Sequence, residues 1–131
     1  MSRKSLLILA FANLLGPGPG QAHHSFAAFF DSTKIVRIRG TVTDFHFTNP
    51  HGTIGVQVVS DDGKLQKWRV ETNAPVVLAR RGWSRDVIKA GQTISIEGWV
   101  ARDGKPYLRL RQAYDASGKL IGEAAFGQTD N

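Results

Sequence analysis

The sequence has no cysteine in its 131 residues. Disulfide bonds, thiolate metal ligands and a cysteine nucleophile are therefore excluded, so a small domain made from this chain depends on its packed core for stability. Acidic residues are also few, 11 against 17 lysines and arginines, which gives a formal net charge of +6. The hydrophobic share of 41% is that of an ordinary globular protein. We therefore expect one compact, basic domain.

No hydrophobic run is long enough to cross a membrane, because the apolar stretch at 6–15 falls short of the roughly 20 residues that a spanning helix needs. Two basic residues precede this stretch and the helix-breaking sequence GPGPG follows it, which is typical of a signal peptide. Small residues before a cut after Ala22 predict that 1–22 are removed and that the mature protein begins at His23 in the periplasm. An uncleaved N-terminal anchor is the alternative.

Motifs of the common enzyme classes are missing from the sequence. It has no Ser-His-Asp order, no glycine-rich phosphate loop and no His-Glu-x-x-His. Asp44, Glu71 and Glu97 could supply an acid/base pair, but no spacing requires them to meet. We therefore expect a binding protein that is not an enzyme and has no catalytic residues.

Alternation of apolar and polar residues predicts five strands. The first covers 35–43 and slips by one residue at 44–47, which indicates a bulge. Four further strands are expected near 54–58, 67–71, 93–98 and 108–111, and residues 73–82 predict one short helix that Asn73 caps and Gly82 ends. The order β-β-β-α-β-β, with a glycine inside the first strand, predicts an all-β fold with one helix, a small five-stranded OB-like barrel. An open α+β sheet is the alternative.

The expected organisation has four parts: a signal peptide at 1–22, an N-terminal segment at 23–33, the barrel at 34–122 and a flexible tail at 123–131. The three tryptophans are assigned different roles. Trp68 is expected in the core, and Trp83 is expected to pack the helix against the barrel mouth. Trp99 lies on the polar phase of its strand, so we expect the C-terminal tail to cover it, with an exposed binding aromatic as the alternative.

Several stretches resemble a family of short exported bacterial proteins of unknown function. Members have a mature N-terminus that reads His-His-Ser-Phe and a first long strand that ends in Asn-Pro-His. The matching positions here are His23 to Phe26, Asn49 to His51, Arg81 to Asp86, Gly91, Glu97-Gly98 and Asp103-Gly104. The resemblance spans nearly all of the expected mature domain and implies no particular activity. The chain departs from the family at His46 and Phe29, where members often carry an acidic residue.

The four histidines predict a metal site formed by His23, His24, His46 and His51. A histidine at a mature N-terminus offers its α-amino nitrogen and a ring nitrogen as a chelating pair, to which the other histidines could add. Nitrogen ligands without thiolate suit Cu(II), Zn(II) and Ni(II), and Cu(II) binds most tightly, so copper is the preferred cofactor. The alternative is that the N-terminal tail does not fold back and that His51 only hydrogen-bonds a backbone carbonyl at the end of the strand.

Six basic residues on alternating strand positions predict a second kind of site: Arg37, Arg39, Lys67, Arg69, Arg109 and Arg111. Together they could form one face for an anionic ligand or a protein partner, such as lipid headgroups, a polysaccharide or an acidic protein segment. Export disfavours nucleic acid, although positively charged OB sheets with aromatic side chains commonly bind it. A solvated surface without a ligand is the alternative.

Overall fold

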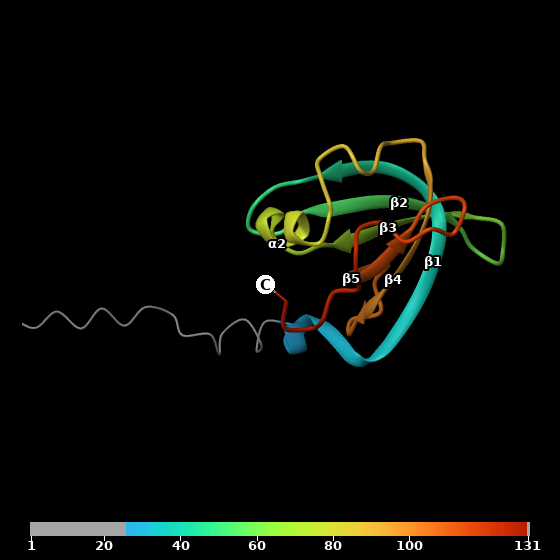
Figure 1. Ribbon diagram of the computed structural model, residues 1–131. Coiled ribbons are helices and arrows are strands. Elements are labelled where there is room, and N and C mark those ends of the chain that lie inside the picture. Colours follow the sequence, from blue (N-terminus) through green and yellow to red (C-terminus); the bar gives the residue numbers. More distant parts are fainter. Residues whose placement is uncertain (1–25, 131) are drawn as a thin grey trace, which may run out of the picture.

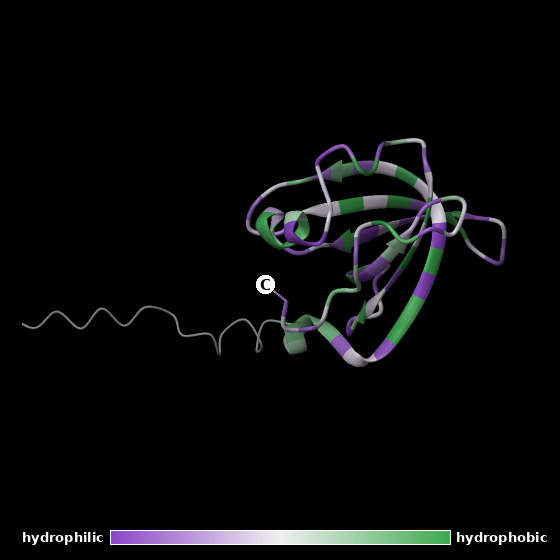
Figure 2. Cartoon of the chain, in the orientation of Figure 1, coloured by the Kyte–Doolittle hydropathy of each residue, from purple (hydrophilic) through white to green (hydrophobic). Residues whose placement is uncertain are grey.

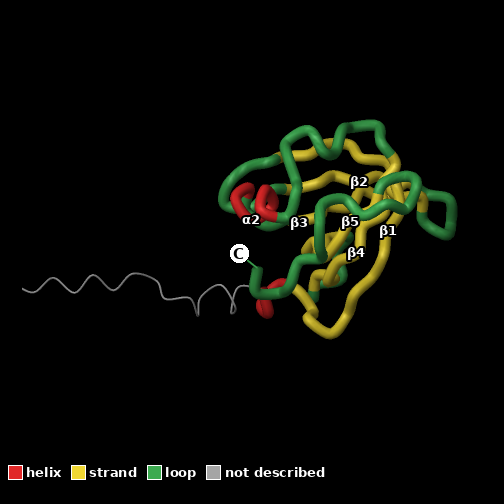
Figure 3. The backbone as a smooth tube through the Cα atoms, in the orientation of Figure 1, coloured by secondary structure: helices red, strands yellow, loops and turns green. Residues whose placement is uncertain are grey.

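The computed structural model describes residues 26–130 (Figure 1). Its elements are β1 (Phe30–His46), β2 (Thr53–Val59), β3 (Leu65–Glu71), α2 (Pro75–Arg80), β4 (Thr93–Ala101) and β5 (Tyr107–Tyr114). The strands close into a barrel in the order β1-β2-β3-β5-β4 (Figure 3). This confirms the predicted OB-like barrel and its element order, and it excludes the open sheet. The expected signal peptide lies outside the described residues.

Strand β1 is long because it serves two neighbours. Its first part pairs with β4 and its last part with β2, and the register shifts between Val42 and Asp44, where the sequence predicts a bulge. A Cβ at Gly40 would lie 2.2 Å from the carbonyl oxygen of Gln57. Glycine is therefore required where β1 turns from one neighbour to the other, and the curved strand can take part in both halves of the barrel.

The barrel closes through a short parallel contact between β3 and β5. Arg69, Val70 and Glu71 pair with Tyr107, Leu108 and Arg109, whereas every other strand pair is antiparallel. The chain reaches this parallel position through α2 and β4, because parallel neighbours need a long crossover connection. The contact brings the end of β3 beside the start of β5, and this junction carries the candidate site.

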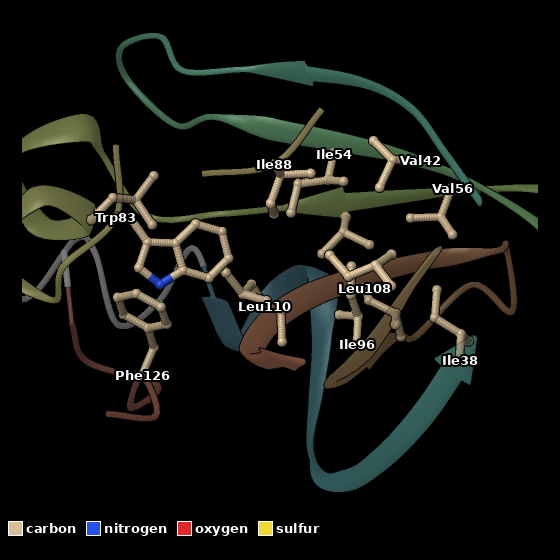
Figure 4. Close-up of a cluster of buried hydrophobic side chains, with 14 of the residues drawn as sticks. Ile38, Val42, Ile54, Val56, Trp83, Ile88, Ile96, Leu108, Leu110 and Phe126 are labelled. Carbon is tan, nitrogen blue, oxygen red and sulfur yellow. The ribbon is translucent and has the colours of Figure 1, made fainter. Parts of the chain in front are cut away.

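Inward-facing side chains of the strands form one hydrophobic core (Figure 4). Its strand members are Ile38, Val42, Ile54, Val56, Val70, Ile94, Ile96, Leu108, Leu110 and Ala113. Hydrophobic and hydrophilic positions alternate along β1 in Figure 2, as the sequence pattern predicts. Leu78 and Trp83 close one end of this core, so Trp83 packs as expected. Trp68 is only half-buried and packs at the core margin.

Helix α2 is shorter than predicted, and its N-terminus differs from the expectation. Ala74 is the N-cap residue, with no side-chain hydrogen bond, and Pro75 occupies the first turn. The prediction that Asn73 caps the helix is therefore wrong, because its buried side-chain amide donates to the carbonyl oxygen of Asp130. Gly82 follows the helix with φ of 78°, so it ends the helix as predicted.

The segment after Gly122 lacks helix and strand, but it packs against the barrel and is not a detached tail. Phe126 is buried in the core cluster, and its backbone N–H donates to the carbonyl oxygen of Arg111 at 2.7 Å. The Arg81 guanidinium donates to the carbonyl oxygen of Ala125 and to the carboxylate of Asp130. These contacts correct the expectation of a flexible tail over the described residues 123–130. Within residues 26–130, no helix is long and apolar enough to span a membrane.

Candidate binding site

A row of side chains crosses the outer face of five neighbouring strands, in the order β1, β2, β3, β5 and β4. Cross-strand pairing places His46 opposite Thr53, Thr53 opposite Glu71, Glu71 opposite Arg109, and Arg109 opposite Trp99. Directly paired residues project from the same face of a sheet. The strand register therefore brings together a histidine, a carboxylate, a guanidinium and an indole that are far apart in the sequence.

Glu71 is the centre of this row because three side chains approach its carboxylate. The Tyr107 hydroxyl donates to Oε2, Arg109 Nη1 donates to Oε1 at 2.9 Å, and His51 Nδ1 lies 3.0 Å from Oε1. We call Glu71, His51, Tyr107 and Arg109 the Glu71 cluster. It joins the ends of three elements: the loop after β1, the end of β3 and the start of β5.

His51 reaches Glu71 because its loop is fastened to the end of β3. The Gly52 N–H donates to the carbonyl oxygen of Asn73, and the Thr72 N–H donates to the carbonyl oxygen of Gly52. A Cβ at Gly52 would lie 2.6 Å from the Thr72 hydroxyl oxygen, so a larger residue would push the loop away. The backbone contacts next to His51 thus fix where its imidazole lies.

Arg109 is a buried arginine, only 4% exposed. Its Nη1 also donates to the carbonyl oxygen of Thr72 at 2.8 Å, and its Nη2 lies 3.5 Å from that of Asp130. Burial lowers the pKa of Arg109, and the adjacent Glu71 carboxylate opposes that effect. Burial and the hydrogen bond to Glu71 raise the pKa of Tyr107, so its hydroxyl stays protonated and donates. The carboxylate is therefore held by two fixed donors.

The expected metal-ligating histidines are only partly described. His46 is largely exposed, and its Nε2 lies 3.2 Å from Oδ1 of Asp44. His51 belongs to the Glu71 cluster, and His46 lies opposite Thr53 in the row. His23 and His24 lie outside the described residues. Among residues 26–130, no group of three or more histidine, aspartate or glutamate side chains is arranged to hold a metal ion.

Two glutamates form ion pairs with three members of the predicted basic face. Glu97 accepts hydrogen bonds from Arg37, Arg111 and Gln112. Burial raises the pKa of Glu97, but the hydrogen bonds from Gln112 and Arg37 outweigh it and leave that pKa below its usual value. Arg109 is buried against Glu71, so the prediction that it lies on an exposed face is wrong. The remaining members are Arg39, which donates to Ser95, and the exposed Lys67 and Arg69.

Trp99 is covered, but the covering ring comes from the other end of the chain than expected. Phe26 makes an edge-on contact with it, with ring centroids 5.4 Å apart, and also contacts Phe30 at 5.6 Å. Phe30 in turn contacts Tyr107 at 5.1 Å. Phe26, the first residue that the structure describes, therefore lies beside the row that contains Glu71 and Arg109.

Sequence reasoning missed the roles of Glu71 and Tyr107. Their only signal is position: Glu71 ends a predicted strand, and Tyr107 and Arg109 share one face of the last strand. That pattern places three polar groups on strand faces without saying which strands are neighbours. The parallel β3–β5 register supplies this information.

The closed barrel and the charged row define a small OB-like β-barrel protein with a candidate binding site at the β3–β5 junction. The chain belongs to DUF6152, a family of unknown function, whose sequence model matches residues 14–108. A search of curated proteins found no match.

Two solved structures illustrate the similarity of the fold. The mitochondrial single-stranded DNA binding protein Rim1 of S. cerevisiae is 11% identical, with a TM-score of 0.48, over 70% of this chain and 96% of that chain. TiaS, in a complex with a transfer RNA and ATP, is 15% identical, with a TM-score of 0.46, over 66% of this chain and 19% of that chain. Similarity at this level concerns the path of the chain and carries no ligand over.

Proposed function

We propose that this protein is an exported binding module that holds a transition-metal ion, with copper preferred, between His51 and the N-terminal histidines His23 and His24. The observation that carries this proposal is the Glu71 cluster. A carboxylate 3.0 Å from Nδ1 of His51 favours a proton on that nitrogen and leaves Nε2 as the ligating atom. Metal-bound histidines characteristically have such a carboxylate partner on the other ring nitrogen.

His51 is the better ligand of the two described histidines. Its side chain is 37% exposed, so an ion can reach it, while Glu71 holds the ring from the protected side. The carboxylate itself is held by Tyr107 and Arg109, which reduces the cost of ordering the ligand. His46 is more exposed, and its Nε2 already faces Asp44. We therefore assign it the role of an additional ligand beside His51 and the N-terminal histidines.

Chain length allows the N-terminal histidines to reach the cluster, because only a short segment separates them from the described Phe26. Phe26 packs on Trp99, and Trp99 and Glu71 are separated in the row by β5 alone, a distance of about 10 Å at the usual strand spacing. His23 precedes Phe26 by three residues, and an extended chain covers roughly 3.3–3.6 Å per residue. Cleavage before His23 would add its α-amino nitrogen to the ligands.

The chemistry of these ligands favours copper among the divalent ions. All of the proposed ligand atoms are nitrogen atoms, and the sequence has no cysteine that could supply a thiolate ligand, which would favour other metals. Affinity for such ligands rises along the first-row metals to a maximum at Cu(II). The proposal therefore names a nitrogen-ligated Cu(II) site at the barrel surface and assigns no catalytic step to it.

Copper titration of the secreted protein, with its first residue fixed by mass spectrometry, tests the proposal. We expect His51→Ala to weaken Cu(II) binding strongly and Glu71→Gln to weaken it by about 10–100-fold. One extra residue before His23 should weaken it as well, because the amine no longer chelates with the ring.

Near-UV circular dichroism checks that each variant is folded, and Gln57→Ala is the matched control on the same outer face. Unchanged affinity in the His51→Ala variant would rule out the barrel ligand. Equal affinity with and without the extra residue would rule out the amine chelate.

A further inference from the structure

A groove of about 640 Å³ lies beside the Glu71 cluster, across the outer surface of β1, β2 and β3 and the loop before β5. Its polar lining includes Thr43, Asp44, Thr53, Lys67, Arg69 and Lys105. Gly55 lies between Asp44 and Arg69 in the strand pairing. The side chains of Thr43 and Asp44 lie over Gly55, because a Cβ there would be 2.3 Å from the Thr43 hydroxyl oxygen and 2.3 Å from an Asp44 carboxylate oxygen.

One wall of the groove is cationic. Lys67 and Arg69 project from the same face of β3, about 7 Å apart along the strand, and both are exposed. Neither makes an ion pair within residues 26–130, in contrast to Arg37, Arg109 and Arg111. Lys105 adds a third cation and pairs only with the exposed Asp103 in its own turn. The wall can therefore bind negative groups spaced along an extended chain.

The opposite wall has a different character. Thr43 and Thr53 offer hydroxyl groups, and the exposed carboxylate of Asp44 stands across from the cations. A carboxylate in this position repels a ligand that carries charge at every point, and such repulsion is a usual source of specificity. The pair of walls instead suits a ligand whose anionic groups are separated by neutral hydroxyl groups.

Two aromatic rings, Trp68 and Tyr107, line the groove, and each already contacts other side chains. The ring of Tyr107 lies between Phe30, at 5.1 Å, and the guanidinium of Arg69, at 5.6 Å. The indole of Trp68 packs against the core margin and donates its N–H to Gln66. Proteins that bind single-stranded nucleic acid combine a positive groove with bases stacked on aromatic side chains, whereas both rings here are half-buried and already engaged by other side chains.

We propose that this groove binds an acidic polysaccharide, with Lys67, Arg69 and Lys105 contacting its carboxylate groups and Thr43, Thr53 and Asp44 contacting its hydroxyl groups. The proposal does not depend on the metal site. It keeps Lys67 and Arg69 from the basic surface expected from the sequence and adds Lys105, which that prediction did not include.

Binding of three polymers at equal charge concentration tests the proposal: polygalacturonate, poly-L-glutamate and single-stranded oligo-dT. We expect polygalacturonate to bind most tightly in calorimetric titration, and its affinity to fall as salt rises. The double variant Lys67→Ala and Arg69→Ala should lose about tenfold in affinity. The double variant Arg80→Ala and Lys119→Ala changes the net charge equally outside the groove and should lose little.

A second variant tests the role of the acidic wall. Asp44→Asn removes the repelling carboxylate, so we expect it to raise the affinity for oligo-dT more than that for polygalacturonate. Equal losses in the two double variants would mean that binding reflects net charge alone, and the groove assignment would be wrong. Tighter binding of oligo-dT or poly-L-glutamate to the unmodified protein would overturn the ligand class.

Discussion

Phe126→Ala should destabilise the protein strongly, although the sequence around Phe126 has no pattern of regular structure. The ring is 2% exposed and belongs to the main core cluster. It meets Trp83 edge-on at 6.1 Å and lies 5.7 Å from the guanidinium carbon of Arg81. Replacing a buried phenylalanine with alanine removes its transfer free energy and leaves a cavity, which together cost about 3–5 kcal/mol. This is a large part of the roughly 5–15 kcal/mol that stabilises a typical domain.

Urea unfolding followed by tryptophan fluorescence and far-UV circular dichroism measures the effect. With a slope of about 1–3 kcal/mol per molar urea, the midpoint should fall by at least about 1 M. The matched control is Phe29→Ala, because the Phe29 ring is 63% exposed and its loss should change stability by less than about 0.5 kcal/mol. If both variants stay within about 1 kcal/mol of the parent, the tail does not pack in solution and the reasoning is refuted.

Two further predictions concern a turn and a partly buried carboxylate. Gly122→Ala should destabilise the protein more than Gly118→Ala in the same urea assay. Both glycines have positive φ, but only a Cβ at 122 meets other atoms, 2.5 Å from Nε1 of Trp83; equal losses would contradict the packing argument. Glu97 has a pKa held below its usual value of 4.5, so its stabilisation is present above that pH and is lost as the pH falls through the lower folded-state pKa. In the Glu97→Gln variant, the free energy of unfolding should therefore fall less steeply as the pH is lowered below neutral. If the parent and the variant give parallel curves of unfolding free energy against pH over this range, Glu97 contributes nothing to the acid dependence.

Local patterns were enough to predict most of the fold. Alternation located all five strands, the slip after Thr43 located the bulge, and Gly82 marked the helix end. These features depend on neighbouring residues alone, so sequence order carries them. The first strand begins earlier than predicted, at Phe30, because its first residues pair with the end of β4. That pairing is a long-range contact and leaves no local periodicity.

The candidate site could be predicted only in part, because charge on a strand does not reveal its partner. Arg37 and Arg109 both alternate with apolar residues, yet one is on the surface and the other is buried against Glu71. The difference comes from the β3–β5 register and from Asp130, which lies over Arg109. His51 was identified as a possible ligand from its residue type, but its carboxylate partner depends on the same register.

The two proposed sites share Tyr107 and the additional ligand His46, and this determines which variants can separate them. Tyr107 donates its hydroxyl to Glu71, while its ring lies under the guanidinium of Arg69. Substitutions that share a contacted partner are commonly non-additive, so Glu71→Gln and Arg69→Ala each disturb both sites. His51 contacts the carboxylate and lies outside the groove lining, whereas Lys67 lies opposite Gln57, one row further from Glu71 than Arg69. Loss of metal binding in His51→Ala and of polysaccharide binding in Lys67→Ala, each without the other, is therefore the combination that shows two independent sites.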